Sequence, residues 1–276
     1  MGISINTNVA SSRASNYLAS NHANLQKSLD RLSSGRRITQ PADDAGGLAV
    51  SMKLTHTNKV LRSTTHNIAN AVSLLQVQDG AMKSVADIVS RIGELKAMHS
   101  DVTKSSSDQA NYDSEYTDLK AQITAITSTA DSKGTSFNGI NVFQGNTLSV
   151  DMDETGTTKF GIKVTNISKA AGGGDLKSII DGANLNSITQ AFITNALEEV
   201  ASHRAANGGN VRRLNYQLAN LETQITNLSA ANGRIMDVDI AQESANLARQ
   251  QVLVQASAAM TAQANTSNDV ALMLLR

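Results

Sequence analysis

The stretch from Leu54 to Val89, LTHTNKVLRSTTHNIANAVSLLQVQDGAMKSVADIV, decides the fold of this chain. Its large apolar residues recur at strict seven-residue intervals, at Leu54, Leu61, Ile68, Leu75, Met82 and Val89. A heptad repeat of this length is typical of a helix with one narrow apolar face. It predicts a single helix from just after Pro41 to about residue 100, about 60 to 70 Å long at 1.5 Å per residue. Asp43 and Asp44 are placed to cap its first turn.

A second long helix is predicted nearer the other end of the chain. Its apolar residues step by alternate threes and fours, at Val211, Leu214, Leu218, Leu221, Ile225, Leu228 and Ile235. This pattern predicts an antiparallel pairing with the residue 54–98 helix. Gly233 is expected to end it. The residues expected to pack the two helices together are Leu54, Leu61, Ile68, Leu75, Val89, Leu214, Leu221 and Leu228.

The middle of the chain has a different character. After a predicted turn at residues 105–108 and a further helix reaching Ala130, glycines break the sequence into short alternating segments. The segments 148–152 and 160–164 carry strand and hairpin signals. We expect a small β-rich excursion between helical flanks.

Both ends of the chain, roughly residues 1–40 and 235–276, are predicted to be slim helices with an apolar stripe. Leucines recur every seven residues at the front, and Ile240, Leu247 and Val254 do so at the back. Stripes this thin bury too little apolar surface to offset the conformational entropy of ordering a lone helix. Each arm therefore needs the other arm, or further copies of the chain, to pack against. The expected polymer contacts are Leu18, Leu25, Leu29, Leu32, Ile240, Leu247, Val254, Leu274 and Leu275.

Composition supports long helices packed side by side. Aromatic residues make up 3%, cysteine is absent, and Lys+Arg and Asp+Glu balance at 24 each. Balanced and interspersed charge gives no reason to expect nucleic acid as a partner, and no apolar run is long enough for membrane insertion. The N-terminus lacks the pattern of a Sec signal, which by itself favours a cytoplasmic location.

Catalytic, metal and cofactor sites are not predicted. The five histidines are dispersed, and none lies three or four residues from another. Gly172–Gly174 lacks the Lys-Ser or Lys-Thr of a phosphate-binding loop. Adjacent carboxylates such as Asp43 and Asp44 point in different directions at a helix start. A structural or interaction protein is therefore favoured over an enzyme.

Several motifs resemble those of bacterial flagellin. At the N-terminal side they are Ile5–Asn8 (INTN), Leu29–Ile38 (LDRLSSGRRI) and Asp43–Ala49 (DDAGGLA). Further along they are Phe137–Gly139 (FNG), Asn227–Asp239 (NLSAANGRIMDVD), Ala262–Asn265 (AQAN) and the terminal Leu274–Arg276 (LLR). Because the motifs occur in the right order over about 230 residues, the chain is identified as a flagellin-like sequence.

The resemblance implies a mainly α fold: a long antiparallel helical rod or coiled-coil bundle with a small β-hairpin region and paired terminal helices. Residues 1–42 and 235–276 would form an inner-tube layer that orders on assembly. Residues 43–136 and 186–234 would form the rod, and residues 137–185 its β-rich excursion. The excursion is short, so a minimal flagellin without large outer domains is expected.

The resemblance also implies a function, structural polymerisation into the bacterial flagellar filament used for swimming. It implies type III export in a largely unfolded state and an extracellular filament, which replaces the cytoplasmic expectation. The implied partners are further copies of the chain in a helical filament, an export chaperone at the C-terminal arm, and distal cap and hook-junction proteins. A hook-filament junction or adaptor protein is the alternative.

One surface of some family members is recognised by a vertebrate innate immune receptor. Arg91, Glu94 and Leu95 match that stretch. Gly93 stands where arginine is usual, and residues 123–127 lack the glutamates expected nearby. These departures argue against recognition of this chain.

Overall fold

The computed structural model describes residues 7–128, 134–163 and 174–273. Long helices dominate it, and short strands form two hairpins, so the predicted mainly α fold is confirmed. The chain divides into two compact units: residues 1–58 with 226–276, and residues 59–225. The predicted inner-tube, rod and excursion boundaries stay a prediction.

The predicted central helix is present as a single element, α2 (Ala45–His99, 55 residues). It begins after Pro41, whose ring fixes φ and cannot continue a helical hydrogen-bond pattern. Asp44 caps it, because one carboxylate oxygen accepts the backbone N–H of Gly47 at 2.8 Å. Asp43 does not cap α2: its carboxylate turns back to the N–H groups of Thr39 and Gln40. The prediction of a shared cap is wrong for Asp43.

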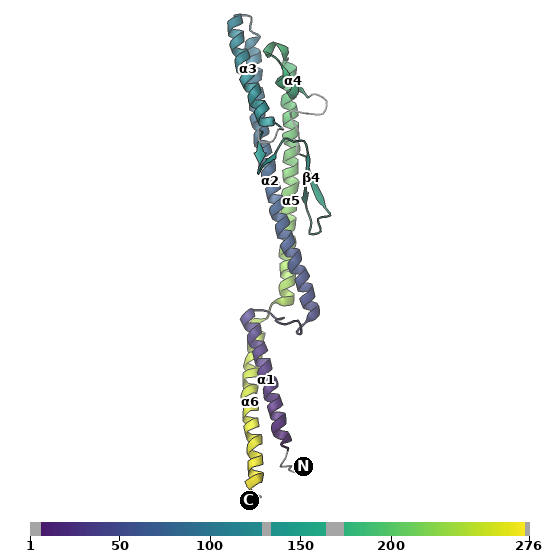
Figure 1. Cartoon of the computed structure of the whole chain (residues 1–276), viewed down its shortest axis with the longest axis vertical. Helices are drawn as coiled ribbons and strands as arrows, with labels where there is room; N and C mark the ends of the chain where they lie inside the picture. Colours follow the sequence, from purple (N-terminus) through teal and green to yellow (C-terminus); the bar gives the residue numbers. More distant parts are fainter. Residues whose placement is uncertain (1–6, 129–133, 164–173, 274–276) are drawn as a thin grey trace. The chain divides into compact units, whose positions relative to one another are not determined.

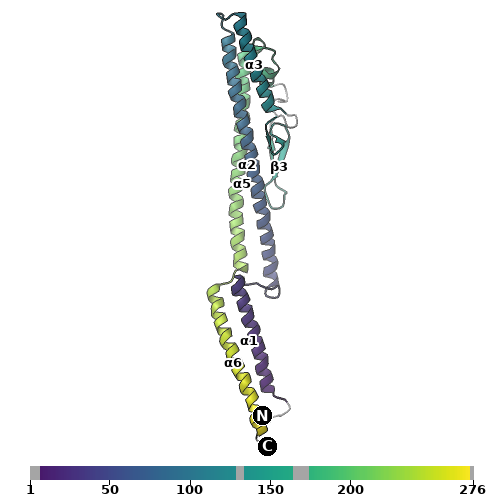
Figure 2. The same ribbon diagram turned by 60° about the vertical axis from the view of Figure 1, so that its left-hand side comes forward.

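In the unit of residues 59–225, α2 and α5 (Gln190–Met236) run side by side in opposite directions (Figures 1 and 2). Side-chain contacts fix this orientation. Arg204 of α5 forms two hydrogen bonds with Asp79, at 2.9 and 3.1 Å, and Asn207 donates to the carbonyl of Leu75 at 2.8 Å. The predicted antiparallel pairing of the two helices is confirmed. Gly233 lies inside α5, which continues to Met236, so the predicted helix end is wrong by three residues.

The apolar heptad of α2 faces the core of this unit. The side chains of Ile68, Leu75 and Val89 are fully buried, and Leu61 and Met82 are almost so. From α5, Leu214 and Leu221 are buried as well. The remaining predicted packing residues, Leu54 and Leu228, lie half-buried in the other unit.

A third helix, α3 (Ser106–Thr127), starts with a reciprocal capping box between Ser105 and Asp108. Arg91 of α2 forms an ion pair with Glu115 of α3 at 2.9 Å. The buried Tyr116 donates its hydroxyl to the carbonyl of Ile179 at 2.5 Å, and burial raises the pKa of Tyr116 to about 12. This hydrogen bond holds α4 (Asp175–Asp181), a short helix that the sequence analysis did not predict, with the 3-10 turn η1 (Leu185–Ser187) following it.

The β-rich excursion consists of two antiparallel hairpins. Strands β1 (Ser136–Phe137) and β2 (Ile140–Asn141) are joined by Asn138 and Gly139, which both have positive φ, at 51° and 79°. Two such residues are what a type I′ hairpin turn needs. Strands β3 (Thr147–Asp151) and β4 (Lys159–Lys163) form the longer pair. The predicted strand segment 148–152 is confirmed with a shift of one residue. Residues 160–163 of the predicted segment 160–164 lie in β4, and Val164 lies outside the described residues.

Replacing Leu75 by alanine tests whether the heptad face forms the core. We expect Leu75→Ala to lower the free energy of unfolding by about 2 to 5 kcal/mol, because it leaves a cavity in a fully buried site. Urea unfolding of the full chain followed by far-UV circular dichroism measures this. The adjacent Gln76 is exposed, so Gln76→Ala should change stability by less than about 0.5 kcal/mol. Equal effects of the two substitutions would contradict the packing.

Candidate assembly surface

The unit of residues 1–58 and 226–276 contains the two terminal helices. Helix α1 (Val9–Ser34) begins at Asn8, whose side chain accepts the N–H of Ser11 at 2.9 Å. It ends at Gly35, which adopts the left-handed conformation at φ 69° that favours glycine at a helix end. Helix α6 (Ile240–Met273) begins at Asp239, whose carboxylate accepts the N–H of Ala241 at 2.9 Å. These local signals set where each helix starts or stops.

Helices α1 and α6 lie against each other (Figure 1), and the predicted pairing of the terminal helices is confirmed. They run antiparallel: Asn8 donates to the carbonyl of Ala264 at 2.9 Å, and Asn21 contacts the carbonyl of Leu253 at 3.4 Å. We call the residues that face the opposite helix the seam. The half-buried predicted contacts in it are Leu18, Leu25, Leu32, Leu247 and Val254.

The seam is thin because its remaining positions are small or polar. Ser28 is buried within it, and Ser11 forms a hydrogen bond with Asn265 at 2.6 Å. A seam in which leucines alternate with serine and asparagine buries less apolar area than an ordinary coiled coil. Its leucines therefore stay partly open to solvent.

Other large apolar side chains of α1 and α6 lie outside the seam and are exposed. We call this set the outer face. Its members, with exposed fractions from 40 to 67%, are Val9, Tyr17, Leu29, Ile240, Val252, Leu253 and Met260. Two residues predicted as polymer contacts, Leu29 and Ile240, belong to it. Leu274 and Leu275 lie outside the described residues. Most of the exposed large apolar side chains in the described residues thus lie on this helix pair.

The segments between the helices are joined by backbone hydrogen bonds. Arg37 N–H donates to the carbonyl of Met236 at 2.6 Å, and Val238 N–H donates to that of Gly35 at 3.1 Å. The guanidinium of Arg37 also donates to the carbonyl of Ile235, at 2.9 and 3.1 Å, and reaches Asp44 at 3.3 Å. Residues far apart in the sequence are thus fixed to each other where α1 ends and α6 begins.

A cluster of four charged residues, Lys27, Arg31, Asp43 and Glu243, supports this junction. Lys27 is 2.5 Å from the Asp43 carboxylate, and Arg31 lies 3.9 Å from Asp43 and 4.0 Å from Glu243. Both carboxylate side chains are almost completely buried, at 5 and 8% exposed. The hydrogen bond from Lys27, with further ones from the N–H groups of Thr39 and Gln40, holds the pKa of Asp43 well below its usual range.

The sequence analysis did not predict this cluster. One signal for it exists, since Glu243 falls three residues after Ile240 and four before Leu247, on the apolar stripe of α6. A carboxylate on a buried stripe requires a cation opposite. Arg31, one residue before Leu32 on α1, supplies it.

The residues matched to the receptor-binding stretch are placed differently from one another. Arg91 and Glu94 are exposed and form an ion pair at 2.8 Å, and Arg91 also binds Glu115. Leu95 is fully buried in this chain and does not contribute to a surface.

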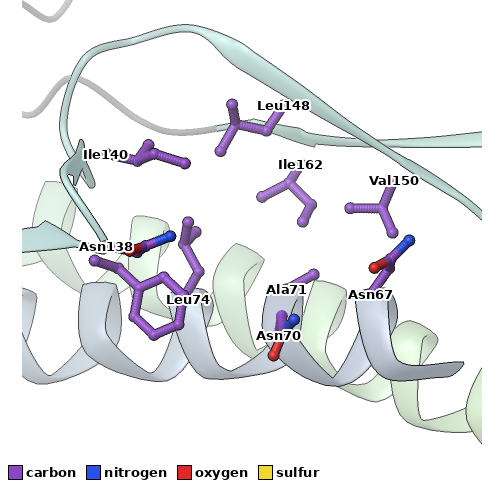
Figure 3. Close-up of a pocket in the computed structure, with 10 residues that line it drawn as sticks. Asn67, Asn70, Ala71, Leu74, Asn138, Ile140, Leu148, Val150 and Ile162 are labelled. Atoms are coloured by element: carbon purple, nitrogen blue, oxygen red, sulfur yellow. The ribbon is translucent and has the colours of Figure 1, made fainter. Parts of the chain in front are cut away.

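The unit of residues 59–225 contains an apolar hollow of about 350 Å³ between α2 and the hairpins. In Figure 3, Leu148, Val150 and Ile162 from β3 and β4 face Ala71 and Leu74 of α2. Its polar lining consists of asparagine amides alone, so it holds no group that exchanges protons near neutral pH.

Across residues 7–128, 134–163 and 174–273, no group of three or more His, Asp or Glu is placed to hold a metal ion. No helix in the same ranges is both long and apolar enough to cross a membrane.

Comparisons with known families agree with the motifs. Residues 5–147 match the model of the bacterial flagellin N-terminal helical region, and residues 190–275 match that of the C-terminal helical region.

Individual relatives match over nearly their whole length. The chain is 31% identical over 290 residues to the flagellar filament 33 kDa core protein of Treponema phagedenis. It is 33% identical over 281 residues to a flagellin of Halalkalibacterium halodurans and 31% identical over 307 residues to a flagellin of Bacillus subtilis. Each alignment covers 99% of both proteins.

Lowering the pH tests the charged cluster. The pKa of Asp43 is lower in the folded chain than in the unfolded chain, so its contribution to stability is complete above about pH 4 and declines as the pH falls below it. We expect Asp43→Asn to be less stable than the parent at neutral pH and to lose part of the acid dependence of unfolding. Thermal unfolding across an acidic pH series measures both effects.

The matched control is Asp30→Asn, which changes an exposed carboxylate on helix α1. It should retain the parent's acid dependence. If Asp43→Asn and the parent lose stability with the same slope below pH 4, the stabilising role of the Asp43 carboxylate is wrong.

Proposed function

The chain belongs to the bacterial flagellin family and is a structural subunit of the bacterial flagellar filament, and from this premise we propose that the outer face of α1 and α6 is its main assembly surface. The observation that carries the proposal is the exposure of large apolar side chains on the terminal helix pair. Tyr17 is 67% exposed, Met260 64% and Val252 63%. Burying such side chains against further copies supplies the free energy of polymerisation.

The thin seam supports the same proposal. Leu18, Leu25 and Leu32 are only half-buried in the single chain, so neighbouring copies gain by completing their burial. We infer that the terminal helices acquire their full order on assembly. This order on assembly is the physical basis that we propose for the predicted inner-tube layer, residues 1–42 and 235–276; residues 43–136, 137–185 and 186–234 stay assigned to the rod and its excursion.

The contact between copies must be heterologous. An isologous contact, in which the same surface of both copies meets, closes into a dimer, whereas a filament needs one surface of a copy to meet a different surface of the next copy. A heterologous contact that does not close on itself generates a helical filament. Rotation of such a filament by a separate motor produces swimming.

One of the remaining partners follows from the same surface. The apolar side chains of the outer face are exposed to solvent before assembly. An amphipathic helix of this kind can lay its apolar face into the groove of a chaperone. We therefore infer an export chaperone on the C-terminal arm. Secretion through the flagellar export apparatus and contacts with distal cap and hook-junction proteins are proposed from membership of the flagellin family, not from this surface. We infer that recognition by an innate immune receptor is further disfavoured, because Leu95 is fully buried and only Arg91 and Glu94 of the matched residues are exposed.

The alternative function, a hook-filament junction or adaptor protein, is not favoured. The relatives described above are two flagellins and a flagellar filament core protein. Bulk assembly separates the two functions, because a filament subunit forms long polymers and an adaptor does not.

Removing either arm tests the need for both terminal helices. We expect chains lacking residues 1–35 or 241–276 to remain soluble and to form no filaments, because each deletion removes one side of the seam. Negative-stain electron microscopy of salt-induced assembly provides the measurement, with the full chain as the positive control. Filaments of normal appearance from either truncation would refute the proposal.

A single substitution tests the outer face. Leu253, 40% exposed, becomes polar in Leu253→Gln while the seam stays intact. We expect the critical concentration for assembly to rise about tenfold, because about 1.4 kcal/mol of apolar burial is lost. Sedimentation of assembled protein over a concentration series measures it.

Gln255→Ala is the matched control on the same helix, since Gln255 is exposed and already polar. Its critical concentration should stay close to that of the parent. An unchanged critical concentration for Leu253→Gln would exclude this part of the outer face.

A further inference from the structure

Two methionines are largely exposed among those whose side chains the structure describes. Met52 on α2 is 65% exposed and Met260 on α6 is 64% exposed. Three others are buried in the described residues: Met82, Met152 and Met236, at 1, 7 and 8%. Because thioether oxidation needs access of the oxidant to sulfur, the exposed pair should react first.

Met260 differs from Met52 in its location. It lies seven residues after Leu253 and four after the exposed Ala256, so these three form an apolar ridge along α6. The ridge lies beside the seam positions Val254 and Ser257, which face α1. Met260 is thus part of the outer face, whereas Met52 belongs to α2.

We propose that Met260 is an oxidation site that makes assembly sensitive to peroxides: its sulfoxide blocks incorporation of the free subunit, whereas the assembled filament is protected. The inference rests on the proposed assembly surface. It adds a chemical state of the subunit that the proposed function does not require.

The reaction consumes one peroxide for each methionine. A lone pair of the Met260 sulfur attacks one oxygen of hydrogen peroxide, an S–O bond forms and the O–O bond breaks. The departing hydroxide takes the remaining proton and leaves as water. Sulfur loses two electrons and the peroxide gains them. The product is a methionine sulfoxide, whose polar S–O group accepts hydrogen bonds on a side chain that was apolar before oxidation.

The effect on assembly follows from desolvation. An exposed sulfoxide is hydrated in the free subunit at no cost. Burying it against the apolar outer face of another copy removes that water without a matching donor, which weakens binding by about tenfold or more. Met52 has almost the same exposed fraction but lies on α2, outside the outer face, so we expect its sulfoxide to leave assembly unchanged.

Partial oxidation of the parent chain tests this without any substitution. Purified monomer is treated with hydrogen peroxide, quenched, assembled in salt and separated by sedimentation. Peptide mass spectrometry then gives the sulfoxide content of each methionine in the two fractions. We expect Met260 sulfoxide to be depleted about tenfold from filaments, and Met52 sulfoxide to be distributed evenly. An even distribution of Met260 sulfoxide overturns the inference.

Two variants provide a matched comparison. Met260→Leu should keep assembling after peroxide treatment, and Met52→Leu, with almost the same exposed fraction at the replaced site, should be inhibited like the parent. Methionine sulfoxide reductase should restore assembly of the oxidised parent. Peroxide inhibition of Met260→Leu equal to that of the parent overturns the inference.

Footprinting of preformed filaments separates this inference from the proposed function. If Met260 in filaments is oxidised as fast as in the monomer, the outer face is not the assembly surface and both proposals fail. If Met260 is protected there but its sulfoxide enters filaments freely, the assembly surface stands and the oxidation inference alone is wrong.

Discussion

The constraint on which the structure depends is the thinness of the seam between α1 and α6. Leu18, Leu25 and Leu32 repeat at the spacing of a coiled coil, yet serine and asparagine occupy the positions between them. Helices α1 and α6 pair, but they bury only part of their apolar surface, and the side chains of the outer face stay exposed. A fully apolar seam would give a self-sufficient helical hairpin with less reason to bind copies of itself.

Next to this seam, polar contacts fix the positions of segments that bury little apolar surface. Arg31 lies close to two buried carboxylates, and Lys27 satisfies one of them. Interactions of this kind hold the segments in place, and removing one partner is costly because it leaves a buried charge uncompensated. They specify the junction between α1, α2 and α6, while the heptad core of residues 59–225 supplies the stability.

The sequence predicted those features that depend on a repeated pattern. The heptad at Leu61, Ile68 and Leu75 identified α2 and its buried face, because a period sustained over many turns outweighs local exceptions. It did not predict that Asp43 turns away from α2, since Lys27 and two backbone N–H groups compete for the same carboxylate. α4, a seven-residue helix, is too short to show a period, and Gly233 is tolerated within α5 because packing outweighs its intrinsic cost.

The paired backbone bonds at the junction have a mechanical consequence. Gly35 bonds to Val238 and Arg37 to Met236, so the two connecting segments form an antiparallel clamp to which both terminal helices are attached from the same end. Tension on either helix therefore reaches both segments together, and neither connector bears the load alone. In a filament under torque, this sharing of load makes it harder to pull one terminal helix away from the rest of its subunit while the other stays in place.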